Sequence, residues 1–238
     1  MFDRSSPFYD EIYSFMDYDA AAAELHRLVI EHGKGETETL LDVACGTGRY
    51  LELLQEHYTV AGLDINPVFL EMAKQRCPSA TLFKEDMRHF KITQQFDVIT
   101  CLFCSIGYLT TLADMEQAVR CMASHLSPQG VMIVEPWISP AQCWTNRVNS
   151  EVLDRPDLKI VRMHTYEKEG ITSVYDIHYL IGTPSGVEHF VEKEVLGLFS
   201  REQYLAAFNK AGLCARVLDK GLFPGHNYGI IVATRVAS

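Results

Sequence analysis

The segment from Leu40 to Leu51 constrains the fold of this chain more than any other. Its first residues, Leu40 to Val43, form an apolar run typical of a buried strand, Gly46 and Gly48 indicate a turn, and the residues beyond Gly48 indicate a helix. In open α/β sheets nucleotide-like ligands bind at such a corner, because backbone N–H groups converge there and glycine lets a ligand approach the main chain. The corner therefore predicts an α/β fold with a site for an adenosine-type cofactor.

Strand and helix patterns alternate through the first 135 residues. Helical spacing over residues 8–32 comes first and stops near Gly33, a residue that suits the end of a helix. The alternation implies right-handed crossovers and a parallel sheet. The predicted strands are 39–43, 59–64, 80–83, 96–102 and 130–135, and the predicted helices are 48–57, one opened by Asn66-Pro67, and 112–126.

The pattern changes after Trp137. Residues alternate with a period of two over 160–166, 171–181 and 187–198, which indicates antiparallel strands. A capping box at Ser200 to Gln203 then opens a helix that ends near Gly212, and strands are predicted at 213–218 and 228–236. We therefore predict a single α/β domain over 1–238, with a Rossmann-like, seven-stranded, mostly parallel sheet and an antiparallel β cap inserted at 138–199 over the acceptor site.

Charge and cysteine usage exclude several functions. The net charge of -10 and the absence of a Lys/Arg run disfavour nucleic acid as a partner. No apolar run is long enough to cross a membrane, and the first residues do not resemble a secretion signal. The seven scattered cysteines favour thiols in a reducing compartment, and the pair Cys101 and Cys104, at the end of a core strand, is interpreted as packing and not as a metal site. We predict a cytoplasmic protein with a small-molecule partner and leave homodimer formation open.

Three features fall at the carboxyl ends of the first three strands and therefore along one edge of the sheet. The glycine turn comes first. Asp64 follows about twenty residues later and can accept both hydroxyls of a ribose, and Asp86 can accept from an adenine amine while Met87 covers the ring. The cofactor-binding candidates from these features are Ala44, Gly46, Gly48, Asp64, Ile65, Asp86 and Met87.

The choice between two cofactors depends on Asp42 and Leu51. A dinucleotide fingerprint requires a third glycine where this chain has Leu51. Asp42 would repel a pyrophosphate but suits the ammonium of a methionyl group. We therefore favour S-adenosylmethionine over NAD and add Asp42 to the cofactor-binding candidates.

Several segments resemble known enzymes. Four segments resemble the ordered motifs of class I S-adenosylmethionine-dependent methyltransferases: Leu41–Gly48, Gly62–Asp64, Glu85–Arg88 and Leu126–Gly130. A finer resemblance, to the N,N-dimethyltransferases of dTDP-linked amino sugars, is carried by Phe103–Leu109, Val134–Trp137, Ile177–Leu180 and Leu198–Tyr204. Together these similarities span nearly the whole chain.

The resemblance implies N-methylation of a small amine or amino sugar by in-line displacement. The alternatives are an O- or C-methyltransferase of a small metabolite and a non-catalytic module that binds S-adenosylmethionine. The resemblance places Tyr13 and Tyr18 over the cofactor, Leu102 near its adenine and Tyr108 beside the methyl group. In two segments this chain departs from the family, because 192–195 and 226–229 do not match the His and Arg pattern with which that family holds a nucleotide diphosphate, and Glu194 would repel phosphates.

The candidate side chains for positioning the amine or moving a proton are tyrosines and histidines. Tyr13 and Tyr108 are the preferred positioning groups, because a phenol oxygen can accept from an amine while the ring walls the site; the alternative is that both are core aromatics. His178 shares a strand face with Asp176 and is a candidate acid/base, or else a hydrogen-bonded sheet residue. His164 and His226 have the same two interpretations. Glu135 and Trp137 follow a strand and either border the acceptor site or pack a loop.

Overall fold

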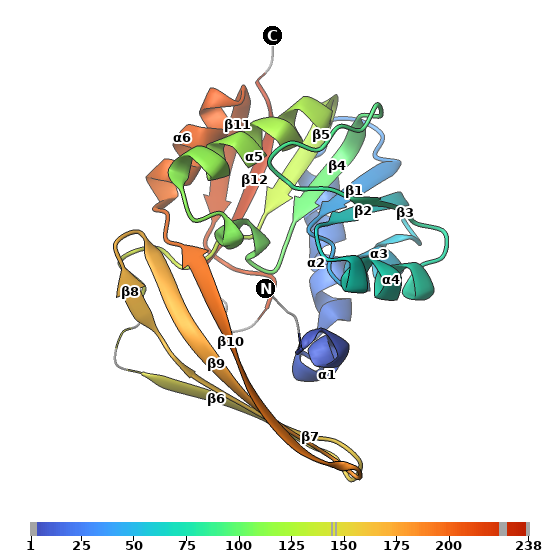
Figure 1. The fold of residues 1–238 in the computed structure, drawn as a ribbon. Coiled ribbons are helices and arrows are strands. Elements are labelled where there is room, and N and C mark those ends of the chain that lie inside the picture. Colours follow the sequence, from blue (N-terminus) through green and yellow to red (C-terminus); the bar gives the residue numbers. More distant parts are fainter. Residues whose placement is uncertain (1–3, 144, 146, 224–227, 237–238) are drawn as a thin grey trace.

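Two β-sheets form the framework of the protein (Figure 1). The computed structural model describes residues 4–143, 145, 147–223 and 228–236. The larger sheet has seven strands in the order β11-β12-β5-β4-β1-β2-β3. Strand β12 pairs antiparallel with β11 and with β5, and the other neighbouring strands of this sheet pair parallel. Its strands are β1 (Thr39–Val43), β2 (Thr59–Asp64), β3 (Thr81–Lys84), β4 (Phe96–Cys101), β5 (Leu126–Val134), β11 (Leu213–Leu218) and β12 (Ile230–Arg235).

Helices cover both faces of the larger sheet. The side chains of α5 and α6 pack on one face, with Met115 and Phe208 at the centre, and those of α2 and α3 pack on the other, with Leu25 and Leu51 buried. The helices are α1 (Tyr9–Ile12), α2 (Tyr18–His32), α3 (Arg49–Leu54), α4 (Pro67–Arg76), α5 (Leu112–His125) and α6 (Arg201–Lys210), with short 3-10 turns η1 (Ser6–Phe8) and η2 (Ser105–Tyr108). This arrangement confirms the predicted Rossmann-like class.

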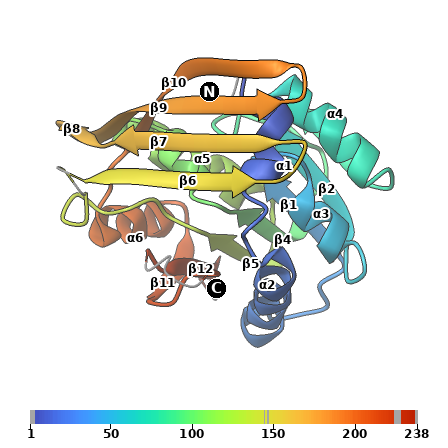
Figure 2. The ribbon, with the colours of Figure 1, turned by 90° about the horizontal axis from the view of Figure 1, so that it is seen from below.

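The second sheet is antiparallel and follows β5 in the chain. Its strands lie side by side in the order β10-β9-β7-β6 (Figure 2), and β8 pairs with β9. Ile12 of α1 packs into the apolar cluster on the sheet's inner face, beside Ile160 and Ile177. The strands are β6 (Val148–Asp154), β7 (Lys159–Thr165), β8 (Glu167–Glu169), β9 (Thr172–Thr183) and β10 (Gly186–Gly197).

Short-range signals account for several of the helix ends. Asn66 accepts from the backbone N–H of Val68 and precedes Pro67 at the first position of α4, as predicted. Ser200 and Gln203 form both hydrogen bonds of the predicted capping box at the start of α6. These caps depend on neighbours within a few residues, so sequence is sufficient to find them.

Strand β6 was not among the predicted strands. Its apolar residues Val148 and Val152 are exposed, whereas Asn149, Glu151 and Leu153 alternate with them toward the inside. The inward face of a strand is usually the apolar one, and β6 inverts that pattern. Polar side chains that face inward need partners there, and they lead to the cavity described below. No helix among the described residues is long and apolar enough to cross a membrane.

Candidate active site

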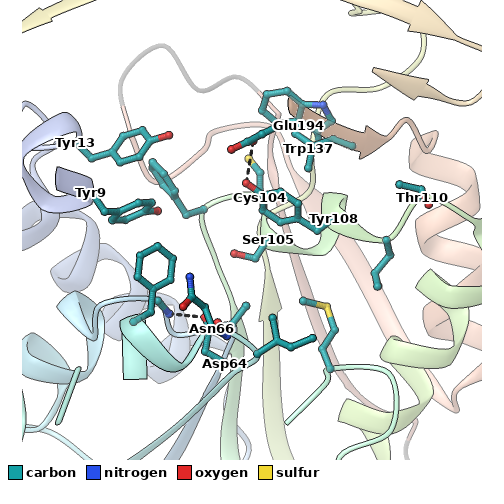
Figure 3. A pocket seen from close by; sticks show the side chains of 18 of the residues that line it. Tyr9, Tyr13, Asp64, Asn66, Cys104, Ser105, Tyr108, Thr110, Trp137 and Glu194 are labelled. Atoms are coloured by element: carbon teal, nitrogen blue, oxygen red, sulfur yellow. Dashed lines mark hydrogen bonds between the residues drawn. The ribbon is translucent and has the colours of Figure 1, made fainter. Parts of the chain in front are cut away.

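A cavity of about 470 Å³ lies between the carboxyl edge of the larger sheet and the inner face of the second sheet. Its wall combines loop residues that follow β1, β2, β3 and β4 with side chains from β6, β7, β9 and β10, and with aromatic residues of the α1 region. Figure 3 shows Tyr9 and Tyr13 on one side, Asp64 and Asn66 below, and Trp137 and Glu194 opposite. A volume of this size suits a small-molecule ligand.

The turn after β1 opens directly into this cavity. Ala44 and Gly46 both have positive φ, of 60° and 54°. A Cβ atom added to Gly46 would meet no other atom within 4 Å, so the space above its backbone belongs to the cavity. A ligand can therefore approach this main chain closely, which is the reason for a glycine here.

Asp64 joins this turn to the end of β2. One carboxylate oxygen accepts from the Gly46 N–H at 2.9 Å, and the other accepts from the Asn66 N–H at 2.8 Å. Burial raises the pKa of Asp64, and the backbone hydrogen bonds act in the opposite direction. The carboxylate is thus held at the cavity wall with acceptor capacity left over, since each oxygen has two lone pairs.

Asp86 lies further along the same edge, after β3. Its carboxylate receives the Arg88 guanidinium, with Nη2 of Arg88 2.6 Å from Oδ2 of Asp86, and this contact lowers the pKa of Asp86. Both residues line the cavity, as do Ile65 and Met87. The pair fixes the orientation of the Asp86 carboxylate.

Three of the predicted cofactor residues have packing roles instead of a place in the wall. A Cβ on Gly48 would lie 2.9 Å from Cβ of Ala73, so this glycine allows α3 and α4 to approach. Leu102 is buried in the apolar core, and Tyr18 packs edge-on against the ring of Tyr50. None of the three is among the residues that line the cavity.

Asp42 is also enclosed, at 2% exposure, and is not part of the cavity wall. The hydroxyl of Thr100 donates to its Oδ1 at 2.7 Å. Burial raises the pKa of Asp42 to about 7, and the nearby Asp64 carboxylate adds to the shift while the Thr100 hydrogen bond opposes it. A buried carboxylate that ionises near neutral pH is costly for the folded state.

A strained turn after β4 presents further wall residues. Phe103 and Cys104 both have positive φ, of 51° and 58°. The N–H of Phe103 donates to the buried carboxylate of Glu135 at 2.7 Å, which holds the turn in place. The following η2 segment carries Tyr108, which lines the cavity. Glu135 therefore supports the turn from behind, while Trp137 lies in the wall.

The second sheet contributes a buried carboxylate, Glu194, at 4% exposure. Its Oε2 accepts from the Tyr108 hydroxyl at 3.0 Å, drawn as a dashed line in Figure 3, and from the Tyr175 hydroxyl at 3.1 Å. Burial raises the pKa of Glu194, whereas the nearby Arg162 and the two phenols lower it. Its Oε1 has no hydrogen-bond partner among the described residues.

Other polar groups of this wall also lack hydrogen-bond partners. Among the described residues, no hydrogen-bond partner is found for Nδ2 of Asn149, Nε of Arg162 or either ring nitrogen of His164. Arg162 faces Glu151 across the β6–β7 pair, with Nη1 3.7 Å from Oε2. Burial and Arg162 lower the pKa of His164 to about 4, so its ring is neutral at pH 7. Buried polar groups are normally satisfied, and such a cluster in a cavity indicates a ligand site.

Tyr13 borders this cluster from the N-terminal segment. Its ring packs edge-on against Phe103, with centroids 5.0 Å apart, and lies 5.5 Å below the Arg162 guanidinium carbon. Burial raises the pKa of Tyr13 to about 12, so its phenol is neutral at pH 7. The ring therefore walls the cavity and leaves its hydroxyl available as a neutral group.

His178 does not fit the acid/base role predicted for it. The side chain is exposed on the outer face of the second sheet, and Nδ1 lies 3.3 Å from Nε2 of His189. The strand alternation was predicted correctly, but the Asp176 and His178 face is the solvent face. The histidine that lines the cavity is His164, while His226 lies outside the described residues.

The sequence interpretation missed Glu151, Arg162 and Asn149 as wall residues. A usable signal existed for Arg162, because it has the same alternation phase as Ile160 and His164 and so belongs to the buried face. Asn149 and Glu151 had no comparable signal, since β6 itself was not recognised.

Comparisons with known proteins agree with this geometry. A family model described as a methyltransferase domain matches residues 40–130. The chain is 37% identical over 216 residues to dTDP-3-amino-3,6-dideoxy-alpha-D-glucopyranose N,N-dimethyltransferase of Streptomyces fradiae, covering 88% of this chain and 84% of that protein. It is also 37% identical over 225 residues to dTDP-4-amino-2,3,4,6-tetradeoxy-D-glucose N,N-dimethyltransferase of Saccharopolyspora spinosa, covering 91% and 90%.

Solved structures extend the similarity to the second sheet. DesVI of Streptomyces venezuelae has a TM-score of 0.92 and 34% identity, covering 99% of this chain and 100% of its own. CalS10, an amino pentose methyltransferase of Micromonospora echinaspora solved with SAM bound, has a TM-score of 0.87 and 30% identity, covering 99% and 98%. The glycine turn, the carboxylates along one sheet edge and the similarity over the whole chain lead to one conclusion: this chain is an S-adenosylmethionine-dependent methyltransferase and belongs to the family of the amino-sugar N,N-dimethyltransferases.

Proposed function

We propose that this enzyme transfers the methyl group of S-adenosylmethionine to the amino group of a sugar held beneath the second sheet. The observation that carries the proposal is the pairing of Tyr108 and Glu194 at the cavity wall. The Tyr108 hydroxyl donates a hydrogen bond to Glu194, so the lone pairs of its oxygen can accept a hydrogen bond from an amine N–H. The similarity to N,N-dimethyltransferases of amino sugars supports nitrogen as the nucleophile.

We assign the cofactor to the half of the cavity beside β1, β2 and β3. The open space above Gly46 and the positive φ of Ala44 fit the close approach of a ligand to the main chain. Asp64 would hold the ribose, and Asp86 with Met87 would surround the adenine. When bound, S-adenosylmethionine supplies an electrophilic methyl group on a sulfonium sulfur.

The residues around the acceptor then have a limited task. The amine nitrogen forms its bond to the methyl carbon as the carbon–sulfur bond breaks, and the electron pair of that bond stays on sulfur. Methyl transfer of this kind requires alignment and exclusion of water more than proton chemistry. Tyr13, Tyr108 and Trp137 supply aromatic walls for both purposes, and the second sheet (within the predicted cap, 138–199) acts as the element that selects the acceptor.

The test is a methylation assay read by mass spectrometry. The enzyme is incubated with isotopically labelled S-adenosylmethionine and with amino sugars that carry the amine at carbon 3 or carbon 4, since the two relatives named above differ in this position. We expect labelled methyl groups on nitrogen. A labelled methyl on oxygen or carbon, or turnover of neither sugar despite cofactor binding, would contradict the proposal.

Tyr108→Phe gives a residue-level prediction. The variant keeps the ring and removes the oxygen that we propose accepts from the amine, a hydrogen bond worth about 1 kcal/mol. We expect kcat to fall about 5-fold while the Kd of S-adenosylhomocysteine, measured by calorimetry, stays unchanged. The matched control is His178→Ala on the outer face, which should leave both values unchanged. An unaltered kcat in Tyr108→Phe would remove the positioning role.

We propose a small-molecule acceptor, no nucleic-acid partner and a cytoplasmic location, with dimer formation left to measurement. Light scattering coupled to size-exclusion chromatography determines the oligomeric state directly.

A further inference from the structure

Charged side chains are unequally represented in the wall of the cavity. Of the described lining residues, two are arginines and six are acids: Asp64, Glu85, Asp86, Asp114, Glu151 and Glu194. Both arginines are engaged, Arg88 with Asp86 and Asp114, and Arg162 with Glu151. A cavity lined by one sign of charge attracts ligands of the opposite sign and repels polyanions.

The half of the cavity beneath the second sheet, which we assign to the methyl acceptor, also has more acids than cations. Arg162 stands directly opposite Glu151 in the β6–β7 register, so its charge is largely balanced there. Glu194 stands opposite Tyr175 on β9, and its Oε2 is hydrogen-bonded to two phenols, while Arg162 is close enough to lower its pKa. Its Oε1 is buried and lacks a hydrogen-bond partner among the described residues, so the wall holds a carboxyl oxygen with acceptor capacity to spare.

We propose that Glu194 binds the acceptor as an ammonium ion, so that the substrate of this enzyme is a cationic amino sugar that carries no nucleotide diphosphate. The proposal rests on the proposed function and narrows its substrate class. An ammonium has three N–H donors, and two of them match the unpartnered Oε1 of Glu194 and the oxygen of Tyr108. Before methyl transfer the ammonium gives one proton to the Glu194 carboxylate, which leaves the neutral amine whose lone pair forms the bond to the methyl carbon. Among the described residues beneath the second sheet that line the cavity, a diphosphate would meet two acids, Glu194 and Glu151, and one cation, Arg162. The relatives named above carry dTDP in the names of their substrates, so the proposal separates this chain from them.

The test is a set of binding measurements by calorimetry on the enzyme saturated with S-adenosylhomocysteine. Three probes are compared: methyl 3-amino-3,6-dideoxyglucoside, the same glycoside with its amine acetylated, and dTDP. We expect the cationic glycoside to bind roughly 10- to 100-fold more tightly than its neutral acetylated form, the range expected for a hydrogen bond to a charged group. We expect dTDP to bind at least 10-fold more weakly than the cationic glycoside.

Glu194→Gln is the matching variant, because glutamine can still accept from Tyr108 and Tyr175. It should lose the preference for the cationic glycoside and bind dTDP more tightly than the wild type does. Glu167→Gln, which removes an exposed acid of β8, is the control and should change neither value. Circular dichroism and the Kd of S-adenosylhomocysteine verify that each variant is folded.

Three results would overturn the proposal: no binding of the cationic glycoside to the wild type, tighter binding of dTDP than of the glycoside, or an unchanged preference in Glu194→Gln. The comparison of probes on the wild type needs no variant, so a folding defect in Glu194→Gln does not prevent a decision. Because these are binding measurements, they are independent of turnover. Loss of N-methylation with ammonium binding intact would refute the proposed function alone.

Discussion

Asp64→Ala should weaken the binding of S-adenosylmethionine at least about 100-fold. The substitution removes the carboxylate that we assign to the ribose, where two hydrogen bonds to a charged group contribute about 1.5 kcal/mol or more each. It also leaves the N–H groups of Gly46 and Asn66 without their present acceptor, and so loosens the turn that opens into the cavity. Titration calorimetry with S-adenosylmethionine and with S-adenosylhomocysteine measures the effect.

Asp97→Ala provides a matched control for this prediction. Asp97 also accepts backbone and hydroxyl hydrogen bonds, from Thr39, but it lies near the start of β4, away from the cavity wall. Its loss should lower the melting temperature and leave cofactor affinity unchanged. Equal affinities for wild type and Asp64→Ala would show that the cofactor is not held at this sheet edge.

Asp42→Asn should stabilise the folded protein, and the gain should grow with pH. The folded pKa of Asp42 is about 7, whereas an ordinary aspartate has a value of 3.8. Between these values the folded state keeps a proton that the unfolded state releases, so stability falls as pH rises through this window and is level above it. With about 1.4 kcal/mol per pKa unit, the gain has an upper bound on the order of 4 kcal/mol above pH 7. Denaturant unfolding from pH 4 to 8 measures it.

The opposite sign is expected for Asp97→Asn. Burial acts to raise the pKa of Asp97, but the hydrogen bonds from Thr39 and Glu38 outweigh it, and the net shift is downward. The folded state therefore loses stability in this variant, and the loss disappears as pH falls through the folded pKa. A stability difference between Asp42→Asn and wild type that does not change with pH would contradict the assigned pKa of Asp42.

The Asp42 measurement also tests the pairing predicted from sequence. If the Asp42 carboxylate interacts with the ammonium of the cofactor, saturating S-adenosylhomocysteine will favour the charged carboxylate and move the pH window downward. An unmoved window would assign Asp42 to the interior of the protein only.

The local part of the site could be read from the sequence. Glycines at 46 and 48, the acids at 64 and 86 and the caps at Asn66 and Ser200 act over a few residues, and each lies at the strand or helix end predicted for it. Even here the sequence could not separate cavity from core. Gly46 faces open space, whereas a side chain on Gly48 would collide with Ala73, a residue of α4.

The acceptor half could not be read in the same way. Period-two alternation identified the two faces of β9 but not which face turns toward the larger sheet, and so the prediction placed the face of Asp176 and His178 toward the pocket. Strand β6 was missed because two of its inward residues, Asn149 and Glu151, are polar, and both line the cavity. Functional walls break the hydrophobic pattern on which sequence interpretation depends.

The sequence by itself determined the fold class and the places of the glycine turn and of the acids at the sheet edge to which we assign the cofactor, because these follow from alternation and from turns that are local in the chain. Only the tertiary structure decided which side chains meet under the second sheet. Tyr108 and Glu194 are separated by 86 residues and meet through the packing of β10 over η2. Burial of that pair, and the charge left over around it, are properties of the packed sheets and of no single segment.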